Sequence, residues 1–92
     1  MLLAEGGSWD CYLLRFPVGS HVPTHHDPVR GRRHFRLNVT LRGAPESVEL
    51  LGPAIARGHR WVLFRPDVVS HRLAPVERPR LELSIGWTRP AS

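Results

Sequence analysis

Three residues of this sequence could together hold a metal ion: His25, Asp27 and His71. Two imidazoles and one carboxylate on one side of an ion, with the opposite positions open, form a ligand set typical of mononuclear non-haem iron(II). Side chains two positions apart in an extended segment point the same way, so His25 and Asp27 can reach one ion whereas His26 cannot. We therefore assign the metal and the catalytic centre to His25, Asp27 and His71.

The third ligand, His71, must come from a segment that is remote in sequence but adjacent in space. It lies in a stretch with extended character, Val68 to Val76. A His-x-Asp pair alone is common by chance, so the residues after His71 add information. An arginine, Arg80, follows nine residues after His71. The ordered set of His-x-Asp, distal His and trailing Arg is the most specific pattern in the chain.

This ordered set resembles the Fe(II)/2-oxoglutarate-dependent oxygenases, in which the distal His is typically followed about nine or ten residues later by an Arg or Lys. The resemblance extends over roughly Trp9 to Trp87, which is nearly the whole chain. Residues 10–17, 23–28 and 34–38 look like the opening strands of the same core.

The resemblance implies specific cofactors and roles. Fe(II) would be held by His25, Asp27 and His71, and 2-oxoglutarate would be the cosubstrate. Arg80 would bind the far carboxylate of 2-oxoglutarate. The reaction implied is a hydroxylase-type oxidation of an unidentified small-molecule or peptide substrate.

Short strands separated by turns are expected throughout the chain. Nine prolines and eight glycines would interrupt most helices, whereas they suit the turns between short strands. Residues 34–42 alternate polar and apolar without a break and form the clearest strand pattern. The expected strands are 11–16, 34–42, 48–51, 61–64 and 80–87. They predict an all-β fold, a small jelly roll of the double-stranded β-helix type with a cupin-like barrel, as one domain over residues 1–92.

The alternating strands leave two interpretations of their polar side chains. In an ordinary sandwich these side chains would meet water, whereas in a cupin-like barrel one polar face lines the pocket. The family resemblance favours the pocket for Arg80 and, by extension, cofactor-binding roles for Asn38, Thr40 and Ser84. Glu82 should share a face with Arg80, where its carboxylate could pair with the arginine and compete with 2-oxoglutarate.

The net charge is +5, and every basic residue is an arginine. Four of them cluster just after the His-x-Asp pair: Arg30, Arg32, Arg33 and Arg36. Such a cluster is compatible with nucleic acid, but a solvated loop beside the pocket mouth is the preferred interpretation.

Size and cysteine content restrict the class of protein further. A chain of 92 residues buries a small core, so formation of a homo-oligomer would help it. The single cysteine, Cys11, excludes an intrachain disulfide and is compatible with a reducing compartment. Residues 1–7 show neither a basic n-region nor a long apolar stretch, and the sequence contains no apolar run of membrane-spanning length. We therefore expect a cytoplasmic protein without a membrane partner.

Two alternative functions remain open. The first is a metal-binding cupin without 2-oxoglutarate chemistry, such as an isomerase, another dioxygenase or a small-molecule sensor. The spacing from Gly19 to His25 fits the first cupin motif, and the spacing from Pro66 to His71 fits the second. The second alternative is a nucleic-acid demethylase, motivated by the arginine cluster.

The remaining histidines and the tryptophans are expected to have structural roles only. His21, His34 and His59 are expected in turns or at a strand start, away from the metal. Large aromatic side chains contribute most when buried, so the tryptophans are expected in the core or at a barrel end. They are Trp9, Trp61 and Trp87.

Overall fold

The computed structural model describes residues 1–19, 21–25, 31–43, 48–73, 75–76 and 78–90. Within these ranges the chain forms β-strands and no helix, as the proline and glycine content predicts. The strands are β1 (Leu2–Glu5), β2 (Trp9–Phe16), β3 (Val22–His25), β4 (Arg32–Arg42), β5 (Val48–Leu50), β6 (Ala56–Arg57), β7 (Trp61–Phe64), β8 (His71–Leu73) and β9 (Arg80–Pro90). In the described part of the chain, no helix is long and apolar enough to cross a membrane.

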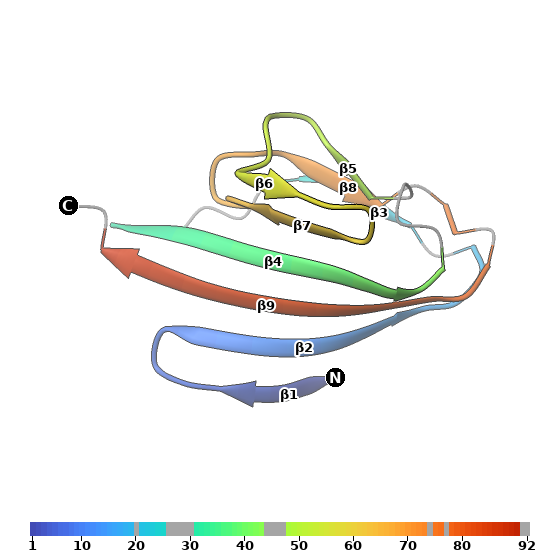
Figure 1. Cartoon of the computed structure of the whole chain (residues 1–92), viewed down its shortest axis with the longest axis horizontal. Helices are drawn as coiled ribbons and strands as arrows, with labels where there is room; N and C mark the ends of the chain where they lie inside the picture. The colour runs from blue at the N-terminus through green and yellow to red at the C-terminus, as the bar shows by residue number, and fades with distance from the viewer. Residues whose placement is uncertain (20, 26–30, 44–47, 74, 77, 91–92) are drawn as a thin grey trace.

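The strands form two antiparallel sheets (Figure 1). The larger sheet has the order β1-β2-β9-β4-β7-β6, and the smaller sheet has the order β3-β8-β5. The last strand, β9, lies between β2 and β4, so the C-terminal strand pairs with two strands from the first half of the chain. This arrangement is a jelly roll of the double-stranded β-helix type, and it confirms the predicted fold class.

The long central strands follow the sequence pattern closely. The predicted strand 34–42 is observed as β4, and 80–87 is observed as β9 with three further residues.

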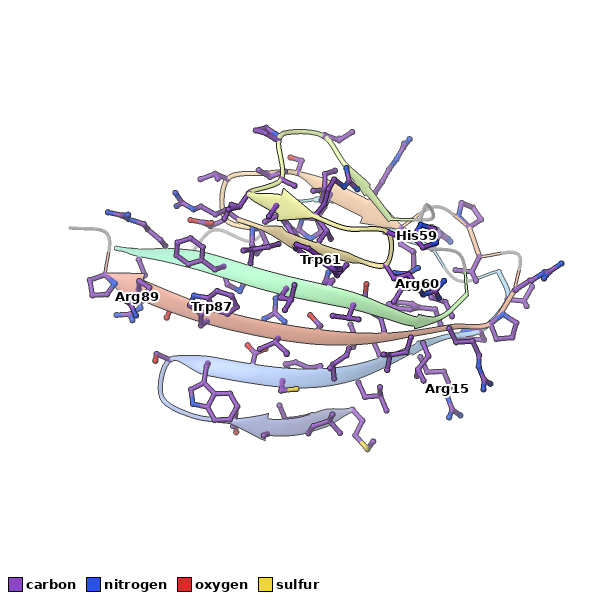
Figure 2. The ribbon with its side chains drawn as sticks, in the orientation of Figure 1. Arg15, His59, Arg60, Trp61, Trp87 and Arg89 are labelled. Carbon is purple, nitrogen blue, oxygen red and sulfur yellow. The ribbon has the colours of Figure 1, made fainter. Side chains whose placement is uncertain are left out.

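Gly43 ends β4 with a φ of 97°, a conformation that favours glycine. A Cβ atom there would lie 3.1 Å from the Cα atom of Arg80, so the turn packs tightly against the start of β9. The guanidinium of Arg60 donates hydrogen bonds to the carbonyl oxygens of Thr40 and Gly43 at the same end of β4 (Figure 2).

The segment around His71 differs from its prediction. Only His71–Leu73 forms a strand, although Val68 to Val76 has extended character. The amides of Val68 and Val69 both donate to the carbonyl oxygen of Arg65, at 3.2 and 2.9 Å, and so close a turn before the strand. The start of this stretch therefore departs from the expected extended character, because local hydrogen bonding forms a turn there.

The polar face of the larger sheet is the more buried one. On β9, Arg80, Glu82 and Ser84 are 2, 5 and 3 % exposed. The alternating residues Leu81 and Leu83 on the other face are only half-buried. The open question about the alternating strands is thus answered in favour of the polar interior, because the smaller sheet covers the polar face.

Two of the three tryptophans, which were expected in the core or at a barrel end, lie outside the core. Trp9 and Trp61 are 45 and 42 % exposed. Each lies three residues after a glycine, Gly6 or Gly58, whose amide donates to the tryptophan carbonyl oxygen at 2.9 Å. The indole lies over that glycine, where a Cβ atom would overlap the ring. These two residues stabilise hairpin turns, and only Trp87 stacks within the sheet, 5.9 Å from the ring of Phe35.

Candidate active site

The pairing of β3 with β8 brings two of the predicted metal ligands together. His25 and His71 are register partners in this antiparallel pair. Opposite residues of such a pair occupy the same face, with Cβ atoms about 4.5–5.5 Å apart. Asp27 and His26 lie outside the described residues, and for residue 25 the structure describes the backbone. In the described part of the chain, no three His, Cys, Asp or Glu residues form a metal-binding group.

The ring of His71 is oriented by two neighbours. Its Nδ1 atom lies 3.2 Å from the carbonyl oxygen of Val69. A carbonyl oxygen only accepts hydrogen bonds, so Nδ1 carries the proton and the lone pair of the neutral ring is on Nε2. Phe64 contacts the ring edge to face at 5.2 Å between centroids. This arrangement fits an imidazole that ligates a metal through Nε2 with its other nitrogen bonded to the protein.

A cavity of about 260 Å³ lies between His71 and the polar face of the larger sheet. One wall comes from β8, and the opposite wall comes from β2, β4 and β9. Both polar and aromatic side chains line it, as in many ligand sites. The lining residues are Leu14, Phe16, Arg36, Asn38, Phe64, His71, Arg72, Leu73, Glu82 and Ser84.

Arg80, which the resemblance predicts to bind a carboxylate, forms a buried ion pair and is not one of the residues that line this cavity. Its Nη2 atom donates to Glu82 Oε1 and to Thr40 Oγ1, both at 2.9 Å. Arg80 and Thr40 line a smaller recess of about 30 Å³, whereas Glu82 lines both the recess and the cavity. The expected pairing of Glu82 with Arg80 is therefore present.

The environment of Glu82 favours its protonated form. Burial raises the pKa of Glu82 above its ordinary value, because a buried carboxylate loses hydration. The hydrogen bond and charge of Arg80, and the charge of Arg36, oppose this effect without cancelling it. The carboxyl group can consequently change its charge in a milder pH range than an exposed glutamate.

A second polar network, centred on Arg36, was missed by sequence reasoning. Arg36 Nη2 donates to both carboxylate oxygens of Asp10, at 2.9 and 3.0 Å, and Nη1 donates to Ser84 Oγ at 2.7 Å. Ser84 Oγ in turn donates to Asn38 Oδ1 at 2.7 Å. Asp10 and Arg36 are both register partners of Gly86, from opposite sides of β9.

Gly86 makes this cross-strand link sterically feasible. A Cβ atom at position 86 would overlap the guanidinium of Arg36. The available sequence signal was a glycine inside the alternating strand 80–87, which indicates close approach of another group. Arg36 thus lies in the cavity wall, and the proposed solvated arginine cluster is wrong for this residue. Arg32 is also engaged, with its Nε donating to Thr88 Oγ1 at 2.8 Å.

The four predicted cofactor-binding residues do share one face of the larger sheet. Asn38 and Ser84 line the cavity, and Thr40 is bonded to Arg80 in the recess. His21 and His59 are exposed, with His59 in the turn between β6 and β7 (Figure 2). His34 lies within β4, and its ring nitrogen Nε2 is 3.4 Å from Arg36 Nη2.

No family model matches this sequence. The structure is similar to the crystal structure of a Pseudomonas putida prolyl-4-hydroxylase, with a TM-score of 0.65 and 24% sequence identity. The match covers 90% of this chain and 52% of that chain, so this chain spans about half the length of the hydroxylase. At this identity the likeness establishes the shared jelly-roll fold.

Proposed function

We propose that this chain is an Fe(II)- and 2-oxoglutarate-dependent oxygenase of the hydroxylase type. The observation that carries the proposal is that His25 and His71 are register partners across β3 and β8, with His71 in the wall of a cavity. A solved structure with the same fold is a prolyl-4-hydroxylase, which supports the same class of reaction.

Each ligand has a defined part in this proposal. His25, Asp27 and His71 would hold Fe(II), and the bond from His71 Nδ1 to Val69 keeps the imidazole in the tautomer that ligates through Nε2. Fe(II) with 2-oxoglutarate would supply the oxidising power for hydroxylation. The protein contributes ligand geometry, a largely apolar pocket surface and fixed charges.

Residues of the cavity wall and of the recess would position the cosubstrate. Arg80 provides a buried positive charge that would orient the far carboxylate of 2-oxoglutarate. Ser84 and Asn38 offer hydroxyl and amide groups on the same wall, held by their mutual hydrogen bond. Leu14, Phe16 and Leu73 line the cavity with apolar surface, which excludes water from the bound cosubstrate.

A spectroscopic titration tests this function. Anaerobic addition of Fe(II) and 2-oxoglutarate should produce the weak visible charge-transfer band of the chelate. His71→Ala should abolish the band, whereas His21→Ala should retain it, because His21 is an exposed histidine outside the site. Absence of the band in wild-type protein with metal demonstrably bound would contradict the proposal.

One observation favours a second candidate, a metal-binding cupin that does not use 2-oxoglutarate. The 2.9 Å ion pair between Arg80 and Glu82 supplies Arg80 with a carboxylate from the protein itself. In that case the metal site would serve an isomerase, another dioxygenase or a sensor. Metal binding without a 2-oxoglutarate chelate would identify this case.

A further inference from the structure

Glu82 lies where a carboxylate ligand of Arg80 would have to bind. Its Oε1 atom is 2.9 Å from Arg80 Nη2, and both side chains are almost fully buried. Glu82 lines both the cavity that His71 lines and the smaller recess that Arg80 lines. A ligand in the cavity can therefore contact Glu82, which is also the ion-pair partner of Arg80 in the recess.

We propose that Glu82 is an internal competitor for Arg80 and determines which anions the site accepts. A dicarboxylate such as 2-oxoglutarate binds when Glu82 takes up one proton from solvent and releases Arg80 to the ligand's far carboxylate. A chelating anion without a far carboxylate, such as oxalate, needs no such exchange. This inference rests on the proposed function, since it concerns the same cosubstrate site.

Electrostatics supports a proton-linked exchange. Two ionised carboxylates cannot share one buried guanidinium without strong repulsion, so one of them becomes protonated. Glu82 is the group already disposed to do so, because burial raises its pKa. The far carboxylate of the ligand can then remain ionised at Arg80.

Other charged groups surround Glu82 and enter the pH dependence. Arg36 on β4 favours the ionised form of Glu82. His71 and Arg72 of β8 line the same cavity, and Arg57 and His59 line the recess. The β2 side chains in the cavity wall, Leu14 and Phe16, carry no charge. Histidine is also ionisable, so the experiment must separate any contribution of His59 and His71 from that of Glu82.

Calorimetric titration of Mn(II)-loaded protein with 2-oxoglutarate and with oxalate makes this separation. Both probes chelate the metal, so the ratio of their Kd values cancels the pH dependence of the metal ligands. Proton uptake is counted by repeating each titration in buffers of different ionisation enthalpy. We expect up to one proton taken up with 2-oxoglutarate beyond that with oxalate, and relative affinity falling by up to about tenfold per pH unit above the pKa of Glu82.

Variants assign the effect to Glu82. Glu82→Gln should remove both the extra proton and the pH dependence of the Kd ratio, and should raise 2-oxoglutarate affinity at alkaline pH. Glu5→Gln changes an exposed carboxyl group on β1. It should leave the extra proton, the pH dependence of the Kd ratio and the 2-oxoglutarate affinity unchanged. His59→Gln should preserve the extra proton, because the side chain of His59 is exposed whereas that of Glu82 is buried beside Arg80. If Glu82→Gln does not fold, the wild-type proton count and Kd ratio still decide the question.

The outcomes separate this inference from the proposed function. If 2-oxoglutarate binds without extra proton uptake and with the pH dependence of oxalate, the inference is overturned while the proposed function stands. If oxalate binds but 2-oxoglutarate does not bind at any pH, Glu82 does not release Arg80 and both are overturned. If neither anion binds the Mn(II)-loaded protein, both are likewise overturned.

Discussion

His25 and His71 are opposite residues of the antiparallel pair β3–β8, although 45 residues separate them in sequence. The turn formed by the Val68 and Val69 amides directs the chain into β8 just before His71. The same turn presents the Val69 carbonyl oxygen to His71 Nδ1. One local structure therefore sets both the position and the tautomer of the distal histidine.

Metal binding should stabilise the fold. A ligand that binds only the native state adds stability by mass action, about 2.7 kcal/mol at a metal concentration 100 times the Kd. Mn(II) should raise the Tm of wild-type protein by several degrees in thermal melts. His71→Ala should lose this shift and His21→Ala should keep it. Equal shifts in the two variants would place the metal elsewhere.

Gly86→Ala should disrupt the Arg36 network. The added Cβ atom would overlap the guanidinium of Arg36, which must then leave Asp10 and Ser84. We expect a loss of about 1–3 kcal/mol in the free energy of unfolding, measured by urea titration. Gly7→Ala is the matched control, because nothing lies within 4 Å of a Cβ atom there. A similar loss in both variants would show that the network contributes nothing specific.

Arg80→Met should be destabilising in a pH-dependent manner. Removing the arginine leaves a buried carboxylate without its charge partner, which typically costs about 3–5 kcal/mol. Burial raises the folded-state pKa of Glu82, so its contribution to stability is greatest at acidic pH and is lost as pH rises through that pKa. The variant should therefore approach wild-type stability at acidic pH.

Denaturant titrations of Arg80→Met across pH measure this effect. Arg89→Met, an exposed site at the far end of β9, should behave like wild type (Figure 2). The double variant Arg80→Met with Glu82→Leu should recover stability at alkaline pH, since no unpaired charge remains buried. A loss in Arg80→Met that does not change with pH would mean that Glu82 stays neutral throughout.

Asp67 should contribute to stability above acidic pH. Burial raises the pKa of Asp67, but hydrogen bonds from Arg65 and the His34 backbone, with the charge of Arg65, outweigh burial and lower it. A lowered pKa gives stability that is present above the unfolded-state pKa and lost as pH falls through the folded-state pKa. Asp67→Asn should therefore be less stable than wild type at neutral pH, with a difference that shrinks in acid melts. An unchanged difference in acid would exclude the ionised carboxylate as the cause.

The alternation of strands 34–42 and 80–87 was sufficient to predict the two central strands of the larger sheet. Period two shows which residues share a face, and it grouped Arg80 with Glu82 and Ser84 correctly. It does not show which face is covered. That depends on the smaller sheet, whose strands of three or four residues carry little pattern of their own.

The remaining features depend on tertiary contacts. The two-residue strand β6 exists because Ala56 and Arg57 pair with β7, and no periodicity can be read from two residues. The ligand order suggested that His25 and His71 converge, but their register is set by pairing between distant strands. The side chains of Arg36 on β4 and Asp10 on β2 meet across β9. The residues next to either one in the sequence therefore give no sign of this ion pair.

Succinate formation tests the central claim most directly. Purified protein supplied with Fe(II), 2-oxoglutarate and air should form succinate slowly without any further substrate, as measured by NMR. Asp27→Ala and His71→Ala should each abolish this turnover, and His21→Ala should retain it. The account predicts succinate that depends on both ligands. Metal-loaded wild-type protein that binds 2-oxoglutarate but forms no succinate, or succinate that persists in His71→Ala, would contradict it.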